Sequence, residues 1–491
     1  MKKNKNDVHL VFIISLVLVI LLYKNVFANN ISLWQKEIIY FIMIDRFCNG
    51  DDSNDLMTDK NNLKLFQGGD IKGIIKKLDY LKDLGITAIW ITPVFKNQSY
   101  FVNSSGYHGY WPVDFYEIDE HFGDKKLFKE LIKQAHKRKI KVIMDITLNH
   151  VAWDHSYVQD PEKYNWFHHE GDIADWNDPV ECENRNVLGL PDFAQENPDL
   201  YKYLKAVSIY WIKEFKIDGF RLDAVKHIPH WFWKKYTSDI FSYKKDFFMI
   251  GEAFLETPEP LADYQSDGIP SLFDIPLYIS IRKSIAQGSS MKDLAKSLED
   301  LNLIYPDPSM MGAFIDSHDT DRFVTSAGND SFHKLRLALT FIYTINRIPV
   351  INYGTESAMS GHNEVSGLYP PENRSMMEFD KNINIKRLIT SLSKIRSRSD
   401  LFSYGSLVNL HVDDKVYSYA RINDNDIAVI ILNNSEKKEK REVDINKYIS
   451  QFNSVEFIDI LTKTKYKVKN GIIKVELKRK QPVILMLYKK R

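Results

Sequence analysis

The sequence predicts an α/β protein built on a (β/α)8 TIM barrel, with a small lobe inserted after the third strand and an all-β sandwich at the C-terminal end. Apolar strand patterns alternate with amphipathic helix patterns over most of the chain, which is typical of a parallel sheet. One connection is far longer than the others, and the last part of the chain changes to strands without helices. A length of 491 residues accommodates a barrel with insertions and one further domain.

Eight strand patterns precede the C-terminal part, and eight is the number that closes a barrel of this kind. They cover residues 38–44, 86–91, 141–146, 217–222, 247–251, 272–275, 311–315 and 348–352. Helix patterns lie between them at residues 71–84, 125–138 and 198–214. Apolar residues recur at three- and four-residue intervals in the first of these helices, and Pro198 suits the first turn of the third.

The expected domain boundaries follow from these patterns. The barrel takes residues 34–150 and 198–400, and the connection at 151–197, rich in Asn, Asp, His and Trp, forms a separate lobe over the functional face. Residues 402–491 form the sandwich, with strands expected at residues 416–421, 427–432, 455–460, 472–477 and 482–487. The dipeptide Asn470-Gly471 is a strong signal for a hairpin turn.

Residues 1–28 have the pattern of a secretory signal peptide. Three lysines within the first five residues provide a positive start, an apolar run covers residues 10–23, and Val26-Phe27-Ala28 offers small residues at a cleavage site. The apolar run is shorter than the roughly 20 residues that a membrane-spanning helix needs. We therefore expect a secreted or cell-surface protein, whose N-terminal segment is either cleaved or kept as an anchor.

The composition excludes one class of partner. The chain has 66 basic and 65 acidic residues and a net charge of +1, so it has no basic excess to neutralise the phosphates of a nucleic acid. Two cysteines, Cys48 and Cys182, cannot form a disulfide framework. A single bridge between them and two free thiols are both compatible with the sequence.

Residues 218–227, Asp-Gly-Phe-Arg-Leu-Asp-Ala-Val-Lys-His, change from a buried strand into a cluster of charges. Unpaired charge is costly inside a strand, but barrel enzymes place their active sites at the C-terminal ends of strands. Arg221 and Asp223 are two residues apart and so point the same way. Arg221 would lower the pKa of Asp223 and keep it ionised, as a nucleophile that attacks a sugar requires. Taken alone, the stretch fits a structural Arg–Asp pair equally well.

Polar residues also follow the third, fifth and seventh strand patterns. If the strands close into a barrel, three acids and two histidines converge on one pocket, namely Asp223, Glu252, Asp319, His150 and His318. Crowded carboxylates push one another's pKa values apart. That supplies one ionised nucleophile and one protonated acid, the pair that retaining glycoside hydrolysis needs.

These four segments, in this order, resemble the four signature regions of the α-amylase family, family 13 of the glycoside hydrolases. The stretch Leu190-Pro191-Asp192-Phe193 in the lobe resembles a fifth region of that family. Any one segment is a weak signal, but four in order at barrel-strand ends are very specific. The resemblance covers residues 34–491 and is closest to the branch of cyclodextrin glucanotransferases and calcium-dependent bacterial α-amylases.

The resemblance implies a role for each matched residue. Asp223 is expected to be the nucleophile that forms a β-glycosyl-enzyme intermediate, Glu252 the general acid and then base, and Asp319 the carboxylate that stabilises the transition state. Tyr110 would stack under the reacting sugar. The residues expected to bind substrate are His108, Tyr110, Trp111, His150, Arg221, Lys226, His227, His318, Glu372 and Arg374.

The same resemblance implies calcium. Asn149 and Asp192 would supply side-chain oxygens and His227 its backbone carbonyl, and oxygen ligands suit Ca²⁺. A second set resembles a calcium loop of the same branch and consists of Asn49, Asp51, Asn54, Asp55, Gly68 and Asp70. Without the resemblance, this acidic run fits a solvated loop of Asx turns. It is not an EF-hand, because no Glu lies at the twelfth position.

Two departures from the transferase branch favour a secreted, endo-acting α-1,4-glucan hydrolase of the α-amylase type. Leu188 stands where transferases carry a central Tyr or Phe, and the chain ends after one β domain, so we expect no starch-binding domain. Phe254 beside Glu252 matches the transferase branch. A glucanotransferase-like or maltogenic transglycosylase therefore remains the alternative.

A function of another class is a non-catalytic glucan-binding protein or a membrane partner protein, which the apolar N-terminus permits. A binding module has no need for Asp223, Glu252 and Asp319 together with Arg221. We therefore expect an enzyme, with a starch-type glucan or maltooligosaccharide as its substrate and a monomeric state.

Overall fold

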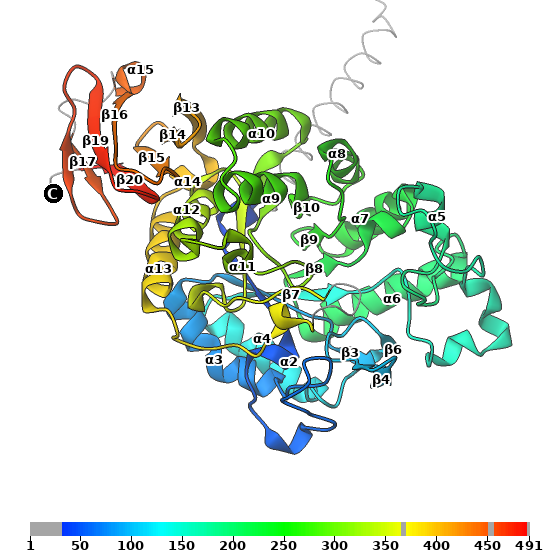
Figure 1. Ribbon diagram of the computed structural model, residues 1–491. Helices are drawn as coiled ribbons and strands as arrows, with labels where there is room; N and C mark the ends of the chain where they lie inside the picture. The colour runs from blue at the N-terminus through cyan, green and yellow to red at the C-terminus, as the bar shows by residue number, and fades with distance from the viewer. Residues whose placement is uncertain (1–31, 365–369, 450–455, 489–491) are drawn as a thin grey trace, which may run out of the picture.

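The computed structural model describes residues 32–364, 370–449 and 456–488, so the expected signal segment at 1–28 lies outside the described residues. Eight parallel strands form one sheet in the order β10-β9-β8-β7-β2-β1-β12-β11. A parallel bridge between Phe273 and Gly312 joins the two edge strands, so the sheet closes into the predicted barrel. Figure 1 shows the C-terminal strands, drawn in orange and red, at one side of the molecule. The strands are β1 (Ile39–Ile42), β2 (Ala88–Ile91), β7 (Lys141–Ile146), β8 (Gly219–Leu222), β9 (Phe248–Gly251), β10 (Ser271–Leu272), β11 (Gly312–Ala313) and β12 (Ile348–Asn352).

The sixth barrel strand is shorter than the sequence predicted. We expected a strand at residues 272–275, but β10 ends at Leu272 and Ile275 begins helix α9. The cause is Asp274, whose side chain accepts a hydrogen bond from the backbone N–H of Leu277 and so starts the helix.

Helices surround the barrel, and the three that the sequence predicted are confirmed as α3, α4 and α6. Asp70 begins α3 by accepting a hydrogen bond from the Gly73 N–H at 2.6 Å, and Gly85 ends it with a φ of 87°. The helices are α2 (Ile44–Phe47), α3 (Ile71–Leu84), α4 (Lys125–Lys137), α5 (Pro179–Asn184), α6 (Pro198–Phe215), α7 (His230–Tyr243), α8 (Pro258–Ser266), α9 (Ile275–Ile281), α10 (Met291–Ile304), α11 (Phe323–Ala327), α12 (Ser331–Thr344), α13 (Ile383–Arg398), α14 (Leu401–Tyr404) and α15 (Asn446–Ile449).

Two excursions leave the barrel at the C-terminal ends of its strands. Residues 151–197, between β7 and α6, carry the short helix α5 and an antiparallel bridge from Phe167 to Phe193. A second excursion follows β2, and the sequence patterns did not predict it. It consists of β3 (Phe95–Asn97), β4 (Tyr100–Phe101), β5 (Ser104–Ser105) and β6 (Pro112–Ile118), in which β3 pairs with β6 and β4 with β5.

The C-terminal part is a sandwich of two antiparallel sheets, in the orders β13-β14-β15-β20-β17-β18 and β16-β19. Residues from both sheets, among them Val429 and Val475, share one buried apolar cluster. The strands are β13 (Ser406–Val412), β14 (Val416–Ile422), β15 (Ile427–Asn433), β16 (Glu439–Asp444), β17 (Glu456–Asp459), β18 (Lys465–Lys467), β19 (Ile472–Leu477) and β20 (Gln481–Leu487). The predicted turn at Asn470-Gly471 is present, because both residues have positive φ and Lys469 pairs with Ile472.

Both cysteines are free thiols, so no bridge joins Cys48 to Cys182. Within residues 32–364, 370–449 and 456–488, no helix is long and apolar enough to cross a membrane.

Candidate active site

A cleft of about 820 Å³ opens at the C-terminal ends of the barrel strands. Every residue that the sequence assigned to catalysis or substrate binding lines this cleft, with one exception. Glu372 is not among the lining residues, and its carboxylate instead accepts a weak hydrogen bond from the backbone N–H of His362 at 3.4 Å. The inserted segment at 151–197 and the segment after β2 contribute to the walls, through Trp176, Leu188 and Phe101 among others.

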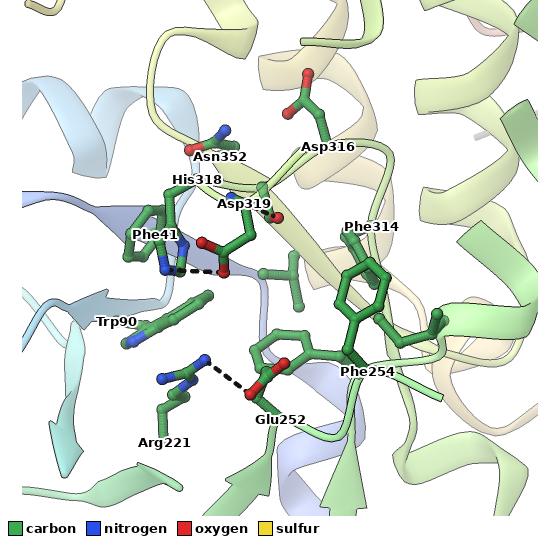
Figure 2. A pocket seen from close by; sticks show the side chains of 14 residues that line it. Phe41, Trp90, Arg221, Glu252, Phe254, Phe314, Asp316, His318, Asp319 and Asn352 are labelled. Atoms are coloured by element: carbon green, nitrogen blue, oxygen red, sulfur yellow. Dashed lines mark hydrogen bonds and ion pairs between the residues drawn. The ribbon is translucent and has the colours of Figure 1, made fainter. Parts of the chain in front are cut away.

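Arg221, on β8, is the charged centre of this site. It is fully buried, and its Nη1 donates hydrogen bonds to Asp223 and to both oxygens of Asp145, at 3.0 and 3.2 Å. Its Nη2 lies 3.6 Å from the Glu252 carboxylate (Figure 2). Burial opposes the charge of Arg221, but the surrounding carboxylates outweigh burial and raise its pKa well above the ordinary value. One fixed positive charge therefore holds three acids in place.

Glu252 follows β9 and is placed beside Asp223 by the turn that ends β8. Ala224 has the left-handed φ of 52°, which is costly for a residue other than glycine, and its N–H donates to Glu252 Oε2 at 3.2 Å. Burial raises the pKa of Glu252 to about 7, and the negative charges of Asp223 and Asp319 add to the rise against the effect of Arg221. Below that pH, Glu252 carries a proton that it can give away.

Asp145 is a member of the site that the sequence assignment missed, although it begins the motif at the end of the third strand. It is fully buried at the end of β7 and also accepts hydrogen bonds from Trp90 Nε1 at 3.1 Å and from the Tyr110 hydroxyl at 2.8 Å. Asp145 therefore fixes the positions of both Arg221 and Tyr110. An Asp within an otherwise apolar strand pattern was the signal that could have identified it.

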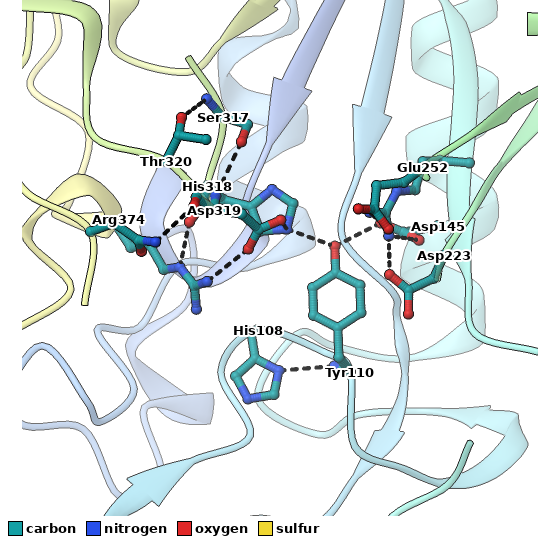
Figure 3. A network of polar contacts seen from close by, with 12 residues as sticks. His108, Tyr110, Asp145, Asp223, Glu252, Ser317, His318, Asp319, Thr320 and Arg374 are labelled. Atoms are coloured by element: carbon teal, nitrogen blue, oxygen red, sulfur yellow. Dashed lines mark hydrogen bonds and ion pairs between the residues drawn. The ribbon is translucent and has the colours of Figure 1, made fainter. Parts of the chain in front are cut away.

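A second charged group lies across the cleft, around Asp319 (Figure 3). Arg374 donates to Asp319 Oδ1 at 3.0 Å, and His318 Nε2 lies 3.1 Å from Asp319 Oδ2 and 3.2 Å from the Tyr110 hydroxyl. The Asp319 side chain is 42% exposed, and the guanidinium groups of Arg374 and Arg221 lower its pKa below the ordinary value. Burial lowers the pKa of His318 to about 3, so the ring is neutral.

The remaining predicted residues hold the loops that shape the cleft. His108 Nδ1 accepts a hydrogen bond from the Tyr110 N–H at 3.0 Å, and His150 Nε2 lies 3.1 Å from the Tyr110 carbonyl oxygen. The Trp111 N–H donates to the Asn97 side chain at 2.7 Å. Burial lowers the pKa of both His108 and His150, so these rings are neutral hydrogen-bonding groups.

Lys226 and His227 lie on the side of the cleft that the inserted segment covers. The indole of Trp176 packs edge-on against His227, and Lys226 Nζ lies 5.5 Å from the centre of the Trp176 ring. Trp176 is 43% exposed and Leu188 79% exposed, and both line the cleft. The sequence assignment missed Trp176, because a tryptophan in a long insertion carries no periodic signal.

The first expected calcium set fits a hard cation. Asn149 Oδ1 and Asp192 Oδ1 are buried and accept no hydrogen bond from any described residue. The Phe193 N–H donates to the Asn149 carbonyl oxygen at 2.8 Å, and His150 forms a bridge with Asp192, so the two segments lie side by side. The described ranges contain no cluster of three His, Cys, Asp or Glu side chains that could hold a metal. An ion here would therefore depend on amide and carbonyl oxygens as well.

The second expected set has fewer oxygens free for a cation. The Asn49 amide donates to both oxygens of Asp55, at 3.0 and 2.8 Å, and Asp51 Oδ1 accepts from the Ser53 N–H. The Asp70 carboxylate accepts three backbone N–H groups, those of residues 50, 51 and 73. Within the described chain, Asn54 Oδ1 is the oxygen of this set that is buried without a hydrogen-bond partner. Gly68 has a φ of 87°, and an added Cβ would collide with Asp55. The hydrogen bonding is that of an Asx-turn loop.

Comparison with known proteins identifies the family. The description "Alpha amylase, catalytic domain" matches residues 41–398, and "Cyclo-malto-dextrinase C-terminal domain" matches residues 410–486. The chain belongs to the α-amylase family. Because this family consists of glycoside hydrolases and transferases, the protein is an enzyme that acts on glycosidic bonds.

The relatives carry several different names. A β/α-amylase of Paenibacillus polymyxa is 35% identical over 91% of this chain, which spans only 37% of the length of that relative. The crystal structure of an Anoxybacillus α-amylase is 38% identical, with a TM-score of 0.87, and covers 93% of this chain and 99% of its own. A cyclomaltodextrin glucanotransferase, CldA, described as having a three-domain ABC distribution, is 34% identical, with a TM-score of 0.82, and covers 92% and 99%. The family is therefore settled, whereas the relatives include both hydrolases and transferases.

Proposed function

We propose that this enzyme is an endo-acting hydrolase of α-1,4-glucans, an α-amylase in the narrow sense, that works by double displacement. The observation that carries the proposal is the placement of Asp223 and Glu252 beside the same guanidinium, that of Arg221. Asp223 is bonded directly to its guanidinium, whereas Glu252 is farther away and has its pKa raised to about 7. An ionised nucleophile beside a protonated acid is the pair that retaining glycosidases require.

In the first step, an oxygen of Asp223 attacks the anomeric carbon while Glu252 gives its proton to the glycosidic oxygen. The glycosidic bond breaks, the leaving sugar departs as an alcohol, and a β-glycosyl ester forms on Asp223. In the second step, the ionised Glu252 takes a proton from water. The water oxygen attacks the anomeric carbon, and Asp223 leaves as a carboxylate. Two inversions at one carbon retain the α configuration.

The surrounding residues support this chemistry through orientation and charge. Asp319, bonded to Arg374, would accept hydrogen bonds from sugar hydroxyls, and neutral His318 would donate one through Nε2. The ring of Tyr110 would lie under the reacting sugar, held there by its hydrogen bond to Asp145. On the leaving-group side, Lys226 and Trp176 offer a cation and an aromatic face to the sugar that departs.

Transglycosylation is the second candidate, and two observations favour it. Phe254, next to Glu252, lines the cleft and is 40% exposed, so it offers an apolar face to an acceptor sugar. CldA, described as a three-domain glucanotransferase, resembles the chain over nearly its whole length. We still favour hydrolysis, because the exposed Leu188 gives a curled glucan no aromatic face to wrap around. Leu188→Tyr should raise the ratio of transfer to hydrolysis products severalfold, and an unchanged ratio would remove this argument.

We further propose that Asn149, Asp192 and the His227 carbonyl bind Ca²⁺, which would join the inserted segment to the barrel. The buried oxygens without hydrogen-bond partners support this set, and the loop at residues 49–70 is the weaker second proposal. Calcium at 100 times its dissociation constant should add about 2.7 kcal/mol to the stability of the protein. An equal thermal shift in Asn149→Ala would contradict the assignment. The N-terminal pattern also supports export from the cell, and a monomer is our working assumption.

The experiment that tests the main proposal is product analysis on soluble starch with the unmutated enzyme and Asp223→Asn side by side. Linear maltooligosaccharides from the unmutated enzyme alone would support the hydrolase. Cyclic products would favour the transferase, and equal activity of Asp223→Asn would refute Asp223 as the nucleophile.

A further inference from the structure

A small cavity of about 30 Å³ lies beside the catalytic groups and shares Arg221, Glu252 and Asp319 with the larger cleft (Figure 2). Most of its lining is apolar, from Phe41, Trp90, Phe273, Phe314 and Val350. The polar side chains that also line it are His318, Asn352, Arg221, Glu252, Asp316, Ser317 and Asp319. One buried water molecule needs roughly 10–15 Å³ and between two and four polar partners, so the cavity is large enough for one.

Asn352, at the end of β12, is the unusual member of this lining. It is 3% exposed, yet neither its Oδ1 nor its Nδ2 has a hydrogen-bond partner among the described residues. A buried amide with no hydrogen-bond partner lowers the stability of a fold by on the order of 1–3 kcal/mol, so its presence calls for an explanation. The function outlined above gives this residue no role.

His318 has a matching need on the same cavity. Its Nδ1 is buried and also has no partner among the residues that the structure describes. Its Nε2 lies beside two hydrogen-bond acceptors. The first is the Tyr110 hydroxyl oxygen, whose single proton is donated to Asp145, and the second is the Asp319 carboxylate. Nε2 must therefore carry the hydrogen of the neutral ring, and Nδ1 is left as an acceptor that needs a donor.

We propose that Asn352 is a positioning residue for catalysis, and that it acts through one water molecule in this cavity, which bonds to the Asn352 amide and donates to His318 Nδ1. The arrangement pairs both buried groups at once. It also pins the imidazole ring in the orientation that aims Nε2–H at Asp319 and at the hydroxyl of a bound sugar. Asn352 is not among the residues that line the larger cleft.

The first test measures the ring of His318 directly and requires no enzyme turnover. In the full-length protein labelled with [¹⁵N]histidine, the His318 signals are found by comparison with His318→Gln, since the chain has 14 histidines. Asn352→Leu keeps the shape of the side chain and removes its polar atoms. We expect the Nδ1 signal to move toward that of a nitrogen without a hydrogen bond, or a second tautomer to appear.

Matched variants separate positioning from packing. Val350→Ala enlarges the same cavity without removing a polar group, so the His318 signals should stay as in the unmutated protein. Asn352→Ser keeps a hydroxyl donor and should restore most of the Nδ1 signal. An unchanged His318 spectrum in Asn352→Leu, or an equal change in Val350→Ala, overturns the proposal.

The kinetic consequence rests on the proposed glycosidase function, and so it is kept separate from the spectroscopic test. Asn352→Leu should lower kcat/KM by about tenfold, mainly through kcat, because His318 contributes most when the transition state forms. If Asn352→Leu does not fold, a crystal structure of the unmutated enzyme decides. An ordered water between Asn352 and His318 Nδ1 supports the proposal, and a dry cavity at high resolution overturns it.

Discussion

Arginines are buried near both ends of the barrel strands, and their surroundings differ. At the C-terminal ends, Arg221 is bonded to two aspartates, with a third carboxylate, that of Glu252, 3.6 Å away. Beside the N-terminal end of β12, Arg396 and Arg421 are bonded to backbone carbonyl oxygens. Arg396 donates to four of them, including those of Tyr343 and Arg347, at distances between 2.6 and 3.4 Å.

The partners of the arginines distinguish a catalytic role at one end of the barrel from a structural role at the other. Around Arg221, burial raises the pKa of two carboxyl groups, Asp145 and Glu252, to about 7. Glu252 lines the cleft, so it is the one that can act as an acid on a substrate. Around Arg396 and Arg421, burial lowers the pKa of each guanidinium, to about 10 and about 9, and nothing there titrates near neutral pH. Their hydrogen bonds instead complete the C-terminal end of α12 and tie the sandwich to the barrel, because Arg421 lies on β14.

Glu252→Gln should give the largest effect and tests the catalytic end. It removes the proton donor but keeps the shape, so kcat on maltooligosaccharides should fall by about 10³-fold. Thermal unfolding at pH 8 should occur at the same or a higher temperature, because a buried carboxylate with a raised pKa destabilises the fold above that pKa. A clear drop in melting temperature would mean that Glu252 is structural.

Arg396→Met tests the opposite end. It leaves four carbonyl oxygens without this donor, and the free energy of unfolding in urea should fall by about 3 kcal/mol. The kcat of the folded fraction should stay within about twofold, since Arg396 is not among the residues that line the cleft. Arg396→Lys, which keeps the charge but not the planar fork, should lose less stability. A large loss of kcat in the folded protein would contradict the purely structural role of Arg396.

The pH dependence should show the smallest effect. The pKa of Glu252 is raised, so its acid form is present below about pH 7 and is lost as the pH rises through that value. We expect kcat/KM to fall by up to tenfold per pH unit above about pH 7. The melting temperature of Arg396→Met should depend on pH in the same way as that of the unmutated protein. A profile that stays flat to pH 9 would assign the proton to another group.

Local patterns account for much of the agreement between the predicted and observed folds. Helix α3 spans the predicted residues 71–84, because Asp70 and Gly85 mark its two ends in the sequence itself. Strands β13, β16 and β18 were missed, since polar stretches such as Glu439–Asp444 form strands only where partners are available. β10 was predicted too long, because the capping role of Asp274 competes with the apolar run around it.

The sequence by itself determined which residues reach the mouth of the barrel. Charged residues that follow apolar runs must leave the strand, so Asp223, Glu252 and Asp319 could be assigned to one pocket before any distance was known. Only the tertiary structure decided which side chains hydrogen-bond to one another and which line the same cavity. Asp145 became the common partner of Arg221 and Tyr110, Asn352 came to share a cavity with His318, and Glu372 was left outside the cleft. Burial and hydrogen bonding depend on side chains from many strands at once, and no single stretch of sequence contains them.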